Sequence, residues 1–477
     1  MSECCTVPST KGPKHLIIVG GGSAAFSAAI RASELGARAT IINERLPMGG
    51  TCVNTGCVPS KALIRTAEAY HRLSHAPFAG MAPGLPSLDF GAVMAQKREL
   101  VAGLRQAKYL GVAGGLEGVR LVEGRAVVRS ARSVEVNGEV LEGDALLMAT
   151  GASPAVPPIP GLAEAGYLTN ESALNLDALP KRLLVLGGNY IGLEMAQAFA
   201  RFGVQVTVLE LMARILPGED EALSIGLLGY LEAEGLKILT DAMTRQVYRD
   251  GKEVVAEVER RGETVPLRAE AILVATGRKP NSRGFGLEEL GVVLDERGFV
   301  RTGEHLQTTV PGVYAAGDVA GAPMFVYTAA YEGALAAENA LGGNSRRKDY
   351  TAVPWVVFTD PQVAGVGLDE AQAKAQGIDA ESSVLPLDHV PRALAARDTR
   401  GFITLVRDRK SDLLVGARIL APEGSELLME IALAMKFKIP VKALAEAFHP
   451  YLTLSEGVKL AAIAFGKDVN RLSCCAS

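Results

Sequence analysis

The stretch that decides the fold is HLIIVGGGSAAFSAAI, at residues 15–30. Residues 15–19 are apolar and partly β-branched, which is typical of a buried parallel strand. Three glycines follow, and the alanine-rich segment 24–35 predicts a helix that ends near Gly36. A second apolar run, at 39–43, ends at Glu44. This order of strand, glycine turn, helix, strand and acid is typical of a dinucleotide-binding unit.

The turn of this first unit has small residues where a phosphate group needs close approach. Gly20, Gly22 and Ala25 occupy the three positions of the fingerprint. Backbone N–H groups and the helix N-terminus are expected to hold a pyrophosphate, and Glu44 is expected to accept hydrogen bonds from a ribose. A glycine-rich turn without a ligand is the alternative, and the agreement of all five elements argues against it.

The same layout returns near residue 183. Strands are expected at 183–186 and 204–209, with a turn from Gly187 to Gly192 and a helix at 193–202 between them. Asn189 stands where the fingerprint has its second glycine, and asparagine tolerates unusual backbone angles. Glu210 closes the second strand, where an acid pairs with a 2′-hydroxyl and repels a 2′-phosphate. On these grounds the unit favours NADH over NADPH, unless Glu210 simply faces solvent or Arg214 offsets its charge.

Composition and charge exclude several classes of protein. The 477-residue chain is 48% hydrophobic and 21% charged, which excludes general disorder. Its net charge of −4 gives no electrostatic case for nucleic acid or an anionic membrane surface. We read no signal peptide and no membrane-spanning segment, so the chain is expected to be cytoplasmic, without membrane insertion. Six cysteines in a chain of this length do not form a disulfide framework.

The most informative stretch for chemistry is GGTCVNTGCVPSK, at residues 49–61. Cys52 and Cys57 begin a helical segment and are spaced so that a disulfide across one helical turn is possible. The field of the helix is expected to lower the pKa of the Cys57 thiol, and Lys61 adds positive charge one turn later. Two buried structural thiols are the alternative. The surrounding glycines argue against that alternative, because bare backbone suits close contact with a flat cofactor.

This segment resembles the redox motif of the FAD-dependent pyridine nucleotide–disulfide oxidoreductases. The resemblance implies that Cys57 is the thiolate nearer the flavin and Cys52 the interchange thiol. It implies that Lys61 lies beside the reactive flavin nitrogen and pairs with Glu194, and that Tyr190 controls nicotinamide access. It also implies NADPH as the reductant, so the preference between the two nicotinamides stays open against Glu210.

The segment TVPGVYAAGD, at residues 309–318, resembles the second FAD motif of that family, with Asp318 directed to the ribityl hydroxyls. Two apolar strands also run into small-residue turns that contain Thr150 with Gly151 and Gly277 with Arg278. Together with Gly50 and Thr51, these residues complete the expected cofactor contacts, alongside Gly187, Gly192 and Glu210 for the nicotinamide dinucleotide.

The fold class that follows is α/β, with two Rossmann-like dinucleotide-binding domains and a C-terminal α+β domain that the resemblance makes a dimerisation domain. The expected divisions are an N-terminal extension at 1–14, an FAD-binding domain at 15–152 and 286–352, an NAD(P)-binding domain at 153–285, and the C-terminal domain at 353–477. The resemblance implies a homodimer whose active site is shared between subunits.

The C-terminal residues point to one branch of the family. Two extra residues separate His449 from the Thr453-x-x-Glu456 element, so the register is wrong for the acid–base pair of disulfide reductases, and a structural role for His449 is favoured. Tyr451 and the tail with Cys474 and Cys475 instead resemble the branch that reduces Hg(II) to Hg(0). Many proteins of that branch carry a metal-binding domain before the FAD-binding unit. We do not expect that domain here, because the FAD-binding unit begins by residue 15.

Soft Hg(II) prefers two thiolates, and a vicinal pair on a mobile tail suits capture of a metal better than a strained disulfide. We therefore expect Cys474 and Cys475 of one subunit to take Hg(II) from thiol complexes and to pass it to Cys52 and Cys57 of the other, with Tyr451 along the path. Two incidental exposed thiols are the alternative reading of the tail. Cys4 and Cys5 are expected to be surface thiols or a minor collecting site.

Two other functions remain to be weighed. The nearest is an NAD-dependent dihydrolipoamide dehydrogenase or a related thiol–disulfide oxidoreductase, in which His449 is the base and Glu210 is consistent with NAD. The other is a non-catalytic thiol buffer for soft metals, which would leave both dinucleotide units without a purpose.

Overall fold

The structure is a computed structural model of the 477-residue chain that describes residues 12–75, 77–82, 84 and 87–471. The chain divides into two compact units. The first comprises residues 1–60, 95–155 and 277–349, and the second comprises 61–94, 156–276 and 350–477. None of the helices in the described ranges combines the length and the apolar character needed to cross a bilayer.

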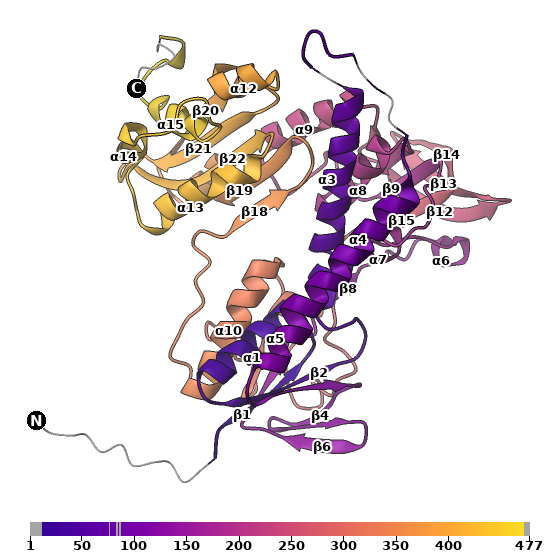
Figure 1. Cartoon of the computed structure of the whole chain (residues 1–477), viewed down its shortest axis with the longest axis vertical. Helices are drawn as coiled ribbons and strands as arrows, with labels where there is room; N and C mark the ends of the chain where they lie inside the picture. Colours follow the sequence, from indigo (N-terminus) through magenta and orange to yellow (C-terminus); the bar gives the residue numbers. More distant parts are fainter. Residues whose placement is uncertain (1–11, 76, 83, 85–86, 472–477) are drawn as a thin grey trace, which may run out of the picture. The chain divides into compact units, whose positions relative to one another are not determined.

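A five-stranded parallel sheet forms the centre of the first unit, in the order β17-β7-β1-β2-β3. Its strands are β1 (His15–Val19), β2 (Arg38–Asn43), β3 (Val119–Glu123), β7 (Ala145–Met148) and β17 (Val313–Ala315). Helices α1 (Ser23–Glu34) and α10 (Val326–Gly342) pack on one face. The antiparallel strands β4 (Val127–Ser130), β5 (Ser133–Val136) and β6 (Glu139–Glu142) cover the other face (Figure 1).

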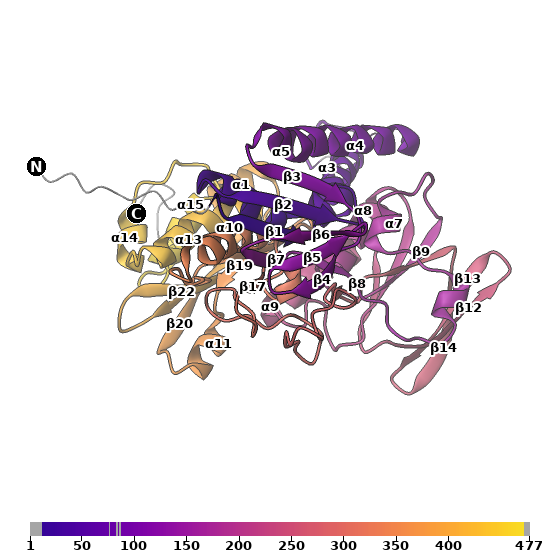
Figure 2. The same ribbon diagram turned by 90° about the horizontal axis from the view of Figure 1, so that it is seen from below.

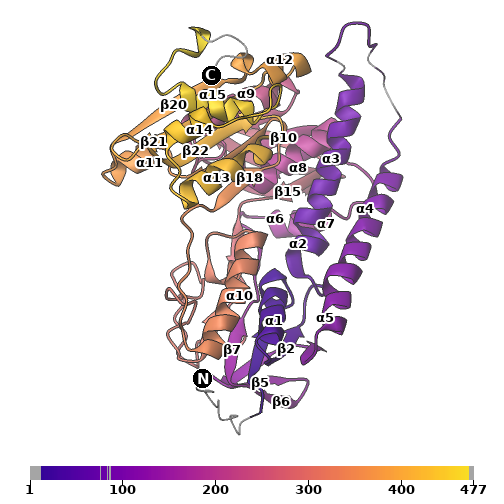
Figure 3. The ribbon, with the colours of Figure 1, turned by 60° about the vertical axis from the view of Figure 1, so that its left-hand side comes forward.

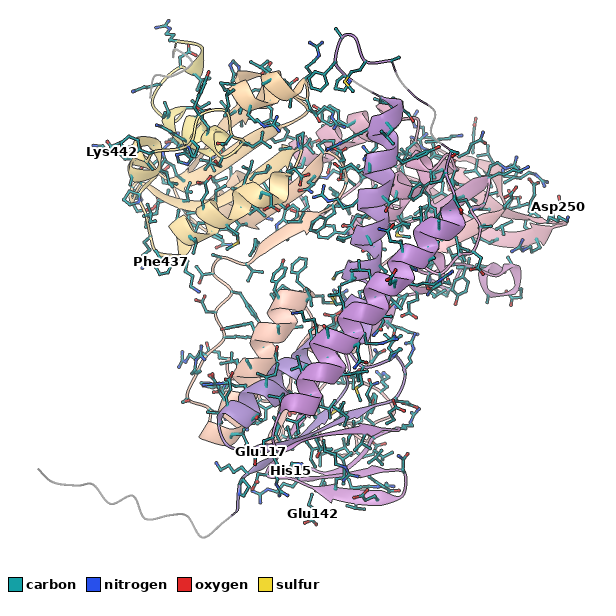
Figure 4. All side chains as sticks on the ribbon, in the orientation of Figure 1. His15, Glu117, Glu142, Asp250, Phe437 and Lys442 are labelled. Carbon is teal, nitrogen blue, oxygen red and sulfur yellow. The ribbon has the colours of Figure 1, made fainter. Side chains whose placement is uncertain are left out.

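The strand β1 is buried over most of its length because both faces of the sheet are covered, which explains its continuous apolar run. Its first residue, His15, is tied to the neighbouring strands by its ring. Nδ1 lies 2.8 Å from the Glu142 carbonyl oxygen and Nε2 lies 2.9 Å from Thr40 Oγ1. Figure 4 shows His15 and Glu142 together at this edge of the sheet.

The remaining elements of the first unit carry the cysteine motif and lie next to the points where the chain passes between the two units. They are α2 (Gly50–Thr55), the start of α3 (Cys57–Ser74), the end of α4 (Phe90–Arg105), a π-helical turn (Gln106–Leu110), α5 (Gly111–Gly115), β8 (Ala152–Pro154) and β16 (Arg278–Pro280). Strands β8 and β16 pair in antiparallel fashion. They follow the turns with Thr150 and Gly151 and with Gly277, which are expected from the sequence to contact the cofactors.

The second unit contains a four-stranded parallel sheet in the order β11-β10-β9-β15. Its strands are β9 (Arg182–Leu186), β10 (Gln205–Leu209), β11 (Lys237–Leu239) and β15 (Ala271–Val274), with helices α6 (Leu162–Ala165), α7 (Asn170–Ala173), α8 (Tyr190–Arg201) and α9 (Glu221–Ala233). An antiparallel group of β12 (Met243–Asp250), β13 (Glu253–Arg260) and β14 (Glu263–Ala269) lies beside β9 (Figure 2). This repeats the architecture of the first unit, as the repeated sequence layout predicts.

The C-terminal part of the second unit is an antiparallel sheet in the order β18-β19-β22-β21-β20. Its strands are β18 (Pro354–Val357), β19 (Gln362–Gly367), β20 (Ala380–Pro386), β21 (Phe402–Asp408) and β22 (Leu413–Ala421), with α11 (Glu370–Ala375), α12 (Pro391–Ala396), α13 (Leu428–Lys436), α14 (Val441–Glu446) and α15 (Glu456–Ile463). Helices α13, α14 and α15 contribute to the core beside this sheet (Figure 3). The α+β fold class expected for the C-terminal domain is therefore confirmed.

Candidate active site

The first dinucleotide turn requires glycine at the position that the fingerprint places first. Gly20 has φ +119°, and a Cβ there would collide with the Ala149 carbonyl oxygen. Gly22 is the N-cap of α1, whose second and third residues, Ala24 and Ala25, are buried against the sheet. The turn therefore presents bare backbone at a helix N-terminus, which is the arrangement that binds a pyrophosphate.

The same turn carries the cysteine motif. The Gly49 N–H donates to the Gly21 carbonyl oxygen at 2.7 Å, and a Cβ built on Gly50 would lie only 2.6 Å from Gly22 Cα. Gly50 also has φ +62°, a conformation that favours glycine. These contacts seat the N-terminus of α2, and with it Cys52, directly against the dinucleotide turn.

Cys52 and Cys57 belong to two consecutive helices. Cys52 lies in α2 and is half-buried, and Cys57 is the first residue of α3 and is exposed. Gly56 separates the helices, and a Cβ on it would lie 3.3 Å from Cys52 Cα. The helix N-terminus at Cys57 favours a thiolate, as the sequence predicts.

Two tyrosines, which sequence reasoning missed, lie close enough to the two cysteines to feel their charge. Burial raises the pKa of Tyr109, whose hydroxyl bonds to Ser23 at the start of α1, and the charges of Cys52 and Cys57 raise it further. Burial also raises the pKa of Tyr327, near the start of α10, and the charge of Cys57 adds to the effect. Tyr109 comes from the π-helical turn at 106–110, and such turns often occur at functional sites.

The second FAD motif ends beside Arg278. Burial raises the pKa of Asp318, and the Arg278 guanidinium, with Nε 3.6 Å from Asp318 Oδ2, acts in the opposite direction. Arg278 also donates to the Ala152 carbonyl oxygen. Among the described residues, its buried Nε has no hydrogen-bond acceptor. A partly buried carboxylate with a hydrogen-bonding deficit beside it fits a site that is completed by polar groups of a ligand.

Two further expected cofactor residues are held by a contact that the sequence did not indicate. Thr150 Oγ1 donates to the Asn281 carbonyl oxygen at 2.6 Å, and Asn281 Nδ2 donates to the Thr150 carbonyl oxygen at 3.0 Å. Gly151 follows with φ +69°. Glu44 lies directly after β2 and is exposed, with Arg125 NH1 3.6 Å away, so its oxygens are accessible to a ribose.

In the second unit, Lys61 and Glu194 form the expected ion pair. Lys61 Nζ donates to Glu194 Oε2 at 2.7 Å, and the other carboxylate oxygen accepts the Phe358 N–H at 2.9 Å. The Lys61 ammonium also lies 4.4 Å from the centre of the Phe358 ring. Phe358 therefore fixes both members of the pair, one by its backbone and the other by a cation–π contact, and its role was not foreseen.

The second dinucleotide turn keeps its glycines where space demands them. Gly187 has φ +107°, and a Cβ on Gly192 would collide with the Gly187 carbonyl oxygen. Asn189 has an ordinary extended conformation, with φ −114°, and its side chain accepts the Tyr190 N–H as the N-cap of α8. The tolerance of asparagine for unusual angles is therefore not what preserves the turn.

Glu210 does not simply face solvent. Its Oε2 accepts the Gly188 N–H at 2.6 Å and its Oε1 accepts the Met212 N–H at 2.7 Å, and the residue is 7% exposed. The guanidinium of Arg214 instead donates to the carbonyl oxygens of Pro217 and Glu219. The acid is thus fixed against the turn.

Tyr190 contacts groups from outside its own helix. Its hydroxyl donates to Glu219 Oε1 at 2.9 Å, and its ring stacks on Trp355 with centroids 5.7 Å apart and an interplanar angle of 26°. The sequence assigned Tyr190 by resemblance alone and gave no signal for Glu219 or Trp355 as its neighbours.

At the C-terminal end, His449 is held by an acid other than Glu456. Its Nε2 lies 3.1 Å from Glu430 Oε2, and its Nδ1 lies 3.3 Å from the Ala447 carbonyl oxygen. Glu456 Oε2 instead accepts the Leu452 N–H. Both ring nitrogens are engaged within a side chain that is 7% exposed, which supports the structural role. Tyr451 is exposed, whereas Cys474, Cys475, Cys4 and Cys5 lie outside the described residues.

Comparisons with known proteins all point to the same family. The model of the pyridine nucleotide-disulphide oxidoreductases matches residues 14–333, and the model of their dimerisation domain matches 353–462. Mercuric reductases from Staphylococcus aureus and Acidithiobacillus ferrooxidans are 43% and 45% identical over 98% and 97% of this chain, covering 85% and 84% of those relatives. A mercuric reductase from Streptomyces lividans is 43% identical over 97% of this chain and 98% of its own length.

Solved structures agree. A Cu(II) complex of the HOCl-induced flavoprotein disulfide reductase RclA from Escherichia coli has a TM-score of 0.85 at 29% identity, covering 96% of this chain and all of that chain. LpdA from Mycobacterium tuberculosis has a TM-score of 0.85 at 29% identity, covering 95% of this chain and all of that one. The chain therefore belongs to the pyridine nucleotide–disulphide oxidoreductases, as an FAD- and nicotinamide-dependent enzyme with the dimerisation domain of that family.

Proposed function

We propose that this chain is a mercuric reductase, which reduces Hg(II) to Hg(0) with electrons from a nicotinamide dinucleotide and so detoxifies mercury. The observation that carries the proposal is the pair Cys52 and Cys57, which lie in the first turn of α2 and at the N-terminus of α3, with the start of α2 packed against the first dinucleotide turn. Relatives named mercuric reductase, at 40–45% identity over nearly the whole chain, support the choice of Hg(II) as the substrate.

The residues around the first turn fit FAD. Gly20, Gly22 and Ala25 would admit its pyrophosphate, Glu44 would accept its ribose hydroxyls, and Asp318 would accept the ribityl hydroxyls. The further contacts proposed for the two cofactors are Gly50, Thr51, Lys61, Thr150, Gly151, Gly277 and Arg278 for FAD, and Gly187, Gly192 and Glu210 for the nicotinamide dinucleotide. When bound, FAD supplies a two-electron carrier between the nicotinamide and the thiols.

In this mechanism each protein group has a separate task. Tyr190 would control where the nicotinamide ring can lie, and Glu194 would hold the Lys61 ammonium in place beside the flavin. Cys52 and Cys57, as thiolates, hold Hg(II) as two soft ligands. The overall reaction balances as NAD(P)H plus Hg(II) giving NAD(P)⁺, one proton and Hg(0), so no protein group has to protonate the metal product.

The chain is a homodimer through its dimerisation domain. We further propose that the active site is shared, with Cys474 and Cys475 of one subunit taking Hg(II) from thiol complexes and delivering it to Cys52 and Cys57 of the other. The exposed Tyr451 would lie along this path. Ligand exchange between thiolates, in which each incoming sulfur binds before an outgoing one leaves, keeps Hg(II) bound to sulfur throughout, which favours a relay over release into water.

The reductant that the second turn favours is NADH. Glu210 keeps its carboxylate at the end of β10 through two backbone N–H groups, where it suits a ribose 2′-hydroxyl and opposes a 2′-phosphate. Arg214, the cation that the sequence places near this turn, donates instead to the carbonyl oxygens of Pro217 and Glu219. A cytoplasmic location fits the proposal, because reduced cysteine pairs persist in a reducing compartment.

The test is Hg(II)-dependent oxidation of NADH and of NADPH, with collection of volatile Hg(0). The wild-type protein should oxidise the nicotinamide only when Hg(II) is present, and Cys52→Ala and Cys57→Ala should each abolish Hg(0) release. Replacing Cys474 and Cys475 together by Ala should impair turnover of thiol-complexed Hg(II) while FAD stays bound. The matched control is the double Ala variant of Cys4 and Cys5. Undiminished mercury release by Cys52→Ala protein would contradict the proposal.

A further inference from the structure

The tyrosine assigned to nicotinamide access lies in a group of four residues that we call the Tyr190 cluster: Tyr190, Glu219, Trp355 and Arg418. They come from the start of α8, the loop before α9, β18 and β22. Glu219 Oε1 accepts the Tyr190 hydroxyl at 2.9 Å, and the Arg418 guanidinium lies 5.7 Å from the Trp355 ring. The aromatic ring of Tyr190 is thus held on one side by stacking and at its tip by a carboxylate.

Arg418 is a fixed part of this cluster. Its side chain is only 3% exposed, and NH1 donates to the carbonyl oxygens of Ala417 at 2.9 Å, Gly367 at 3.2 Å and Val366 at 3.3 Å. Trp355 is fixed as well, because it packs so closely on Gly365 that a Cβ there would lie 2.5 Å from its ring. Tyr190 and Glu219 are therefore the members whose contacts within the cluster can change.

Glu219 has a second partner within reach. Its Oε2 lies 3.8 Å from Arg418 Nε, which is too long for a hydrogen bond. Among the described residues, that buried Nε has no acceptor. Burial raises the pKa of Glu219, and the Tyr190 hydroxyl and Arg418 oppose this shift. A short movement of the carboxylate toward Arg418 would give the guanidinium its missing bond and release the tyrosine hydroxyl.

We propose that Glu219, together with Arg418, is a positioning residue that holds Tyr190 against Trp355 until a nicotinamide dinucleotide displaces the tyrosine. The Glu219–Arg418 contact then shortens and offsets only part of the hydrogen bond that Tyr190 gives up. This inference rests on the proposed function only in that Tyr190 must move for the nicotinamide to enter. The held position lowers the fraction of protein that is ready to bind, and so weakens the apparent affinity for the nicotinamide.

The first measurement uses Trp355, which is the only tryptophan in the sequence. In the FAD-loaded enzyme, Tyr190 covers one face of its ring, so acrylamide should quench its fluorescence weakly. Glu219→Ala and Tyr190→Phe should each increase the quenching constant, and the double variant should add little, because both changes remove the same hydrogen bond. The control Glu232→Ala changes an exposed glutamate on α9 and should leave quenching unchanged.

The second measurement is rapid mixing of the holoenzyme with NADH, which separates apparent affinity from the limiting rate of flavin reduction. Glu219→Ala should lower the apparent Kd for NADH by up to about tenfold, since losing a hydrogen bond to a charged group shifts an equilibrium by that order. Its effect on the limiting rate should be smaller. Glu219→Gln keeps an acceptor oxygen for Tyr190 and should lie between wild type and Glu219→Ala.

Unchanged quenching in folded Glu219→Ala, or an additive double variant, would overturn the proposal, and so would an apparent Kd that stays the same or rises. If Glu219→Ala does not fold, the comparison of Glu219→Gln with Tyr190→Phe decides by the same two readouts. Neither readout uses mercury. A protein that fails to reduce Hg(II) would therefore refute the proposed function while leaving this inference testable.

Discussion

At the residue scale, the sequence predicted those site residues that belong to a short continuous motif. Gly20, Gly22, Cys52 and Cys57 could be found because a turn needs particular backbone space at particular spacing, and the structure brings them together. The partners that come from distant segments could not be found in this way. Tyr109 reaches the cysteines from a π-helical turn that no hydrophobic period predicts.

Phe358, Glu219 and Glu430 were missed for the same physical reason. Each acts on a site residue through a contact that depends on tertiary packing of the second unit, with no local signature in its own sequence. The acid in the His449 contact illustrates this point. Counting residues correctly showed that Glu456 has the wrong register, but only the packing of α13 identifies Glu430 as the partner.

The first residue-scale prediction concerns Glu210. Glu210→Gln keeps an acceptor oxygen for a backbone N–H and removes the charge that opposes a 2′-phosphate. The ratio of kcat/KM for NADPH to that for NADH should rise by roughly tenfold, the equivalent of about 1.4 kcal/mol between two charge states. Steady-state kinetics with both nucleotides measures it. Glu164→Gln, at an exposed position on α6, is the control, and an unchanged ratio would show that Glu210 does not set the preference.

At the element scale, strands were predicted closely and one helix start was not. Strand β1 has the predicted bounds, because continuous apolar burial determines both of its ends. Helix α8 begins at Tyr190, three residues before the predicted Leu193, because the Asn189 side chain caps it. Apolar periodicity does not report such a cap, since the first turn of a helix is often polar or exposed.

The junction between α1 and α2 gives the second prediction. Gly50→Ala places a Cβ 2.6 Å from Gly22 Cα and also strains a backbone with φ +62°. We expect a loss of about 2–4 kcal/mol in unfolding free energy and weaker FAD retention, measured by denaturation and by flavin absorbance after desalting.

The matched control for this prediction is Gly36→Ala. Gly36 has a similar φ of +71°, but nothing lies within 4 Å of its added Cβ. The unfolding free energy of this variant should therefore fall by only about 1–2 kcal/mol, because of backbone strain alone, and the variant should keep its FAD. Equal losses in the two variants would show that the close approach of Gly50 to Gly22 has no energetic consequence.

Helix α3 gives a prediction about pH. Burial, and then the charge of Arg201, lowers the pKa of His71 to about 4 from its ordinary value near 6.5. Between these values the unfolded chain binds a proton that the folded protein does not, so the unfolding free energy falls as the pH falls from 6.5 to 4. Because His71 is only partly buried, solvent screening should limit the loss to about 1–2 kcal/mol.

His71→Gln should remove this part of the acid sensitivity. Denaturant unfolding at pH 6.5 and at pH 4 measures it, and the difference between the two pH values should be about 1–2 kcal/mol smaller in the variant. His389→Gln, at a position away from α3, is the control. A variant with the same difference as wild type would mean that His71 is charged in the folded protein.

At the scale of the whole molecule, the apolar face of α13 needs a partner. Met429, Leu433 and Phe437 recur every four residues and are 54%, 46% and 68% exposed, and Phe448 nearby in sequence is fully exposed. Figure 4 shows Phe437 and Lys442 on the outer side of the C-terminal part. Exposed apolar side chains in such a row indicate an interaction surface. Because the dimerisation-domain model matches residues 353–462, we expect a second copy of the chain to cover it.

Phe437→Glu therefore tests both the dimer and the shared active site. Burying an unpaired charge costs several kcal/mol, so the dimer dissociation constant should rise by roughly a hundredfold or more, measured by size-exclusion chromatography with light scattering. The monomer should keep FAD and still be reduced by NADH, because both dinucleotide turns lie within one chain. Its turnover of thiol-complexed Hg(II) should fall with the dimer fraction, because Cys474 and Cys475 then have no partner subunit to supply.

The control is Val384→Glu, at an exposed apolar position on the edge strand β20, which should stay dimeric and active. A fully active Phe437→Glu monomer would place the whole mercury path within one subunit.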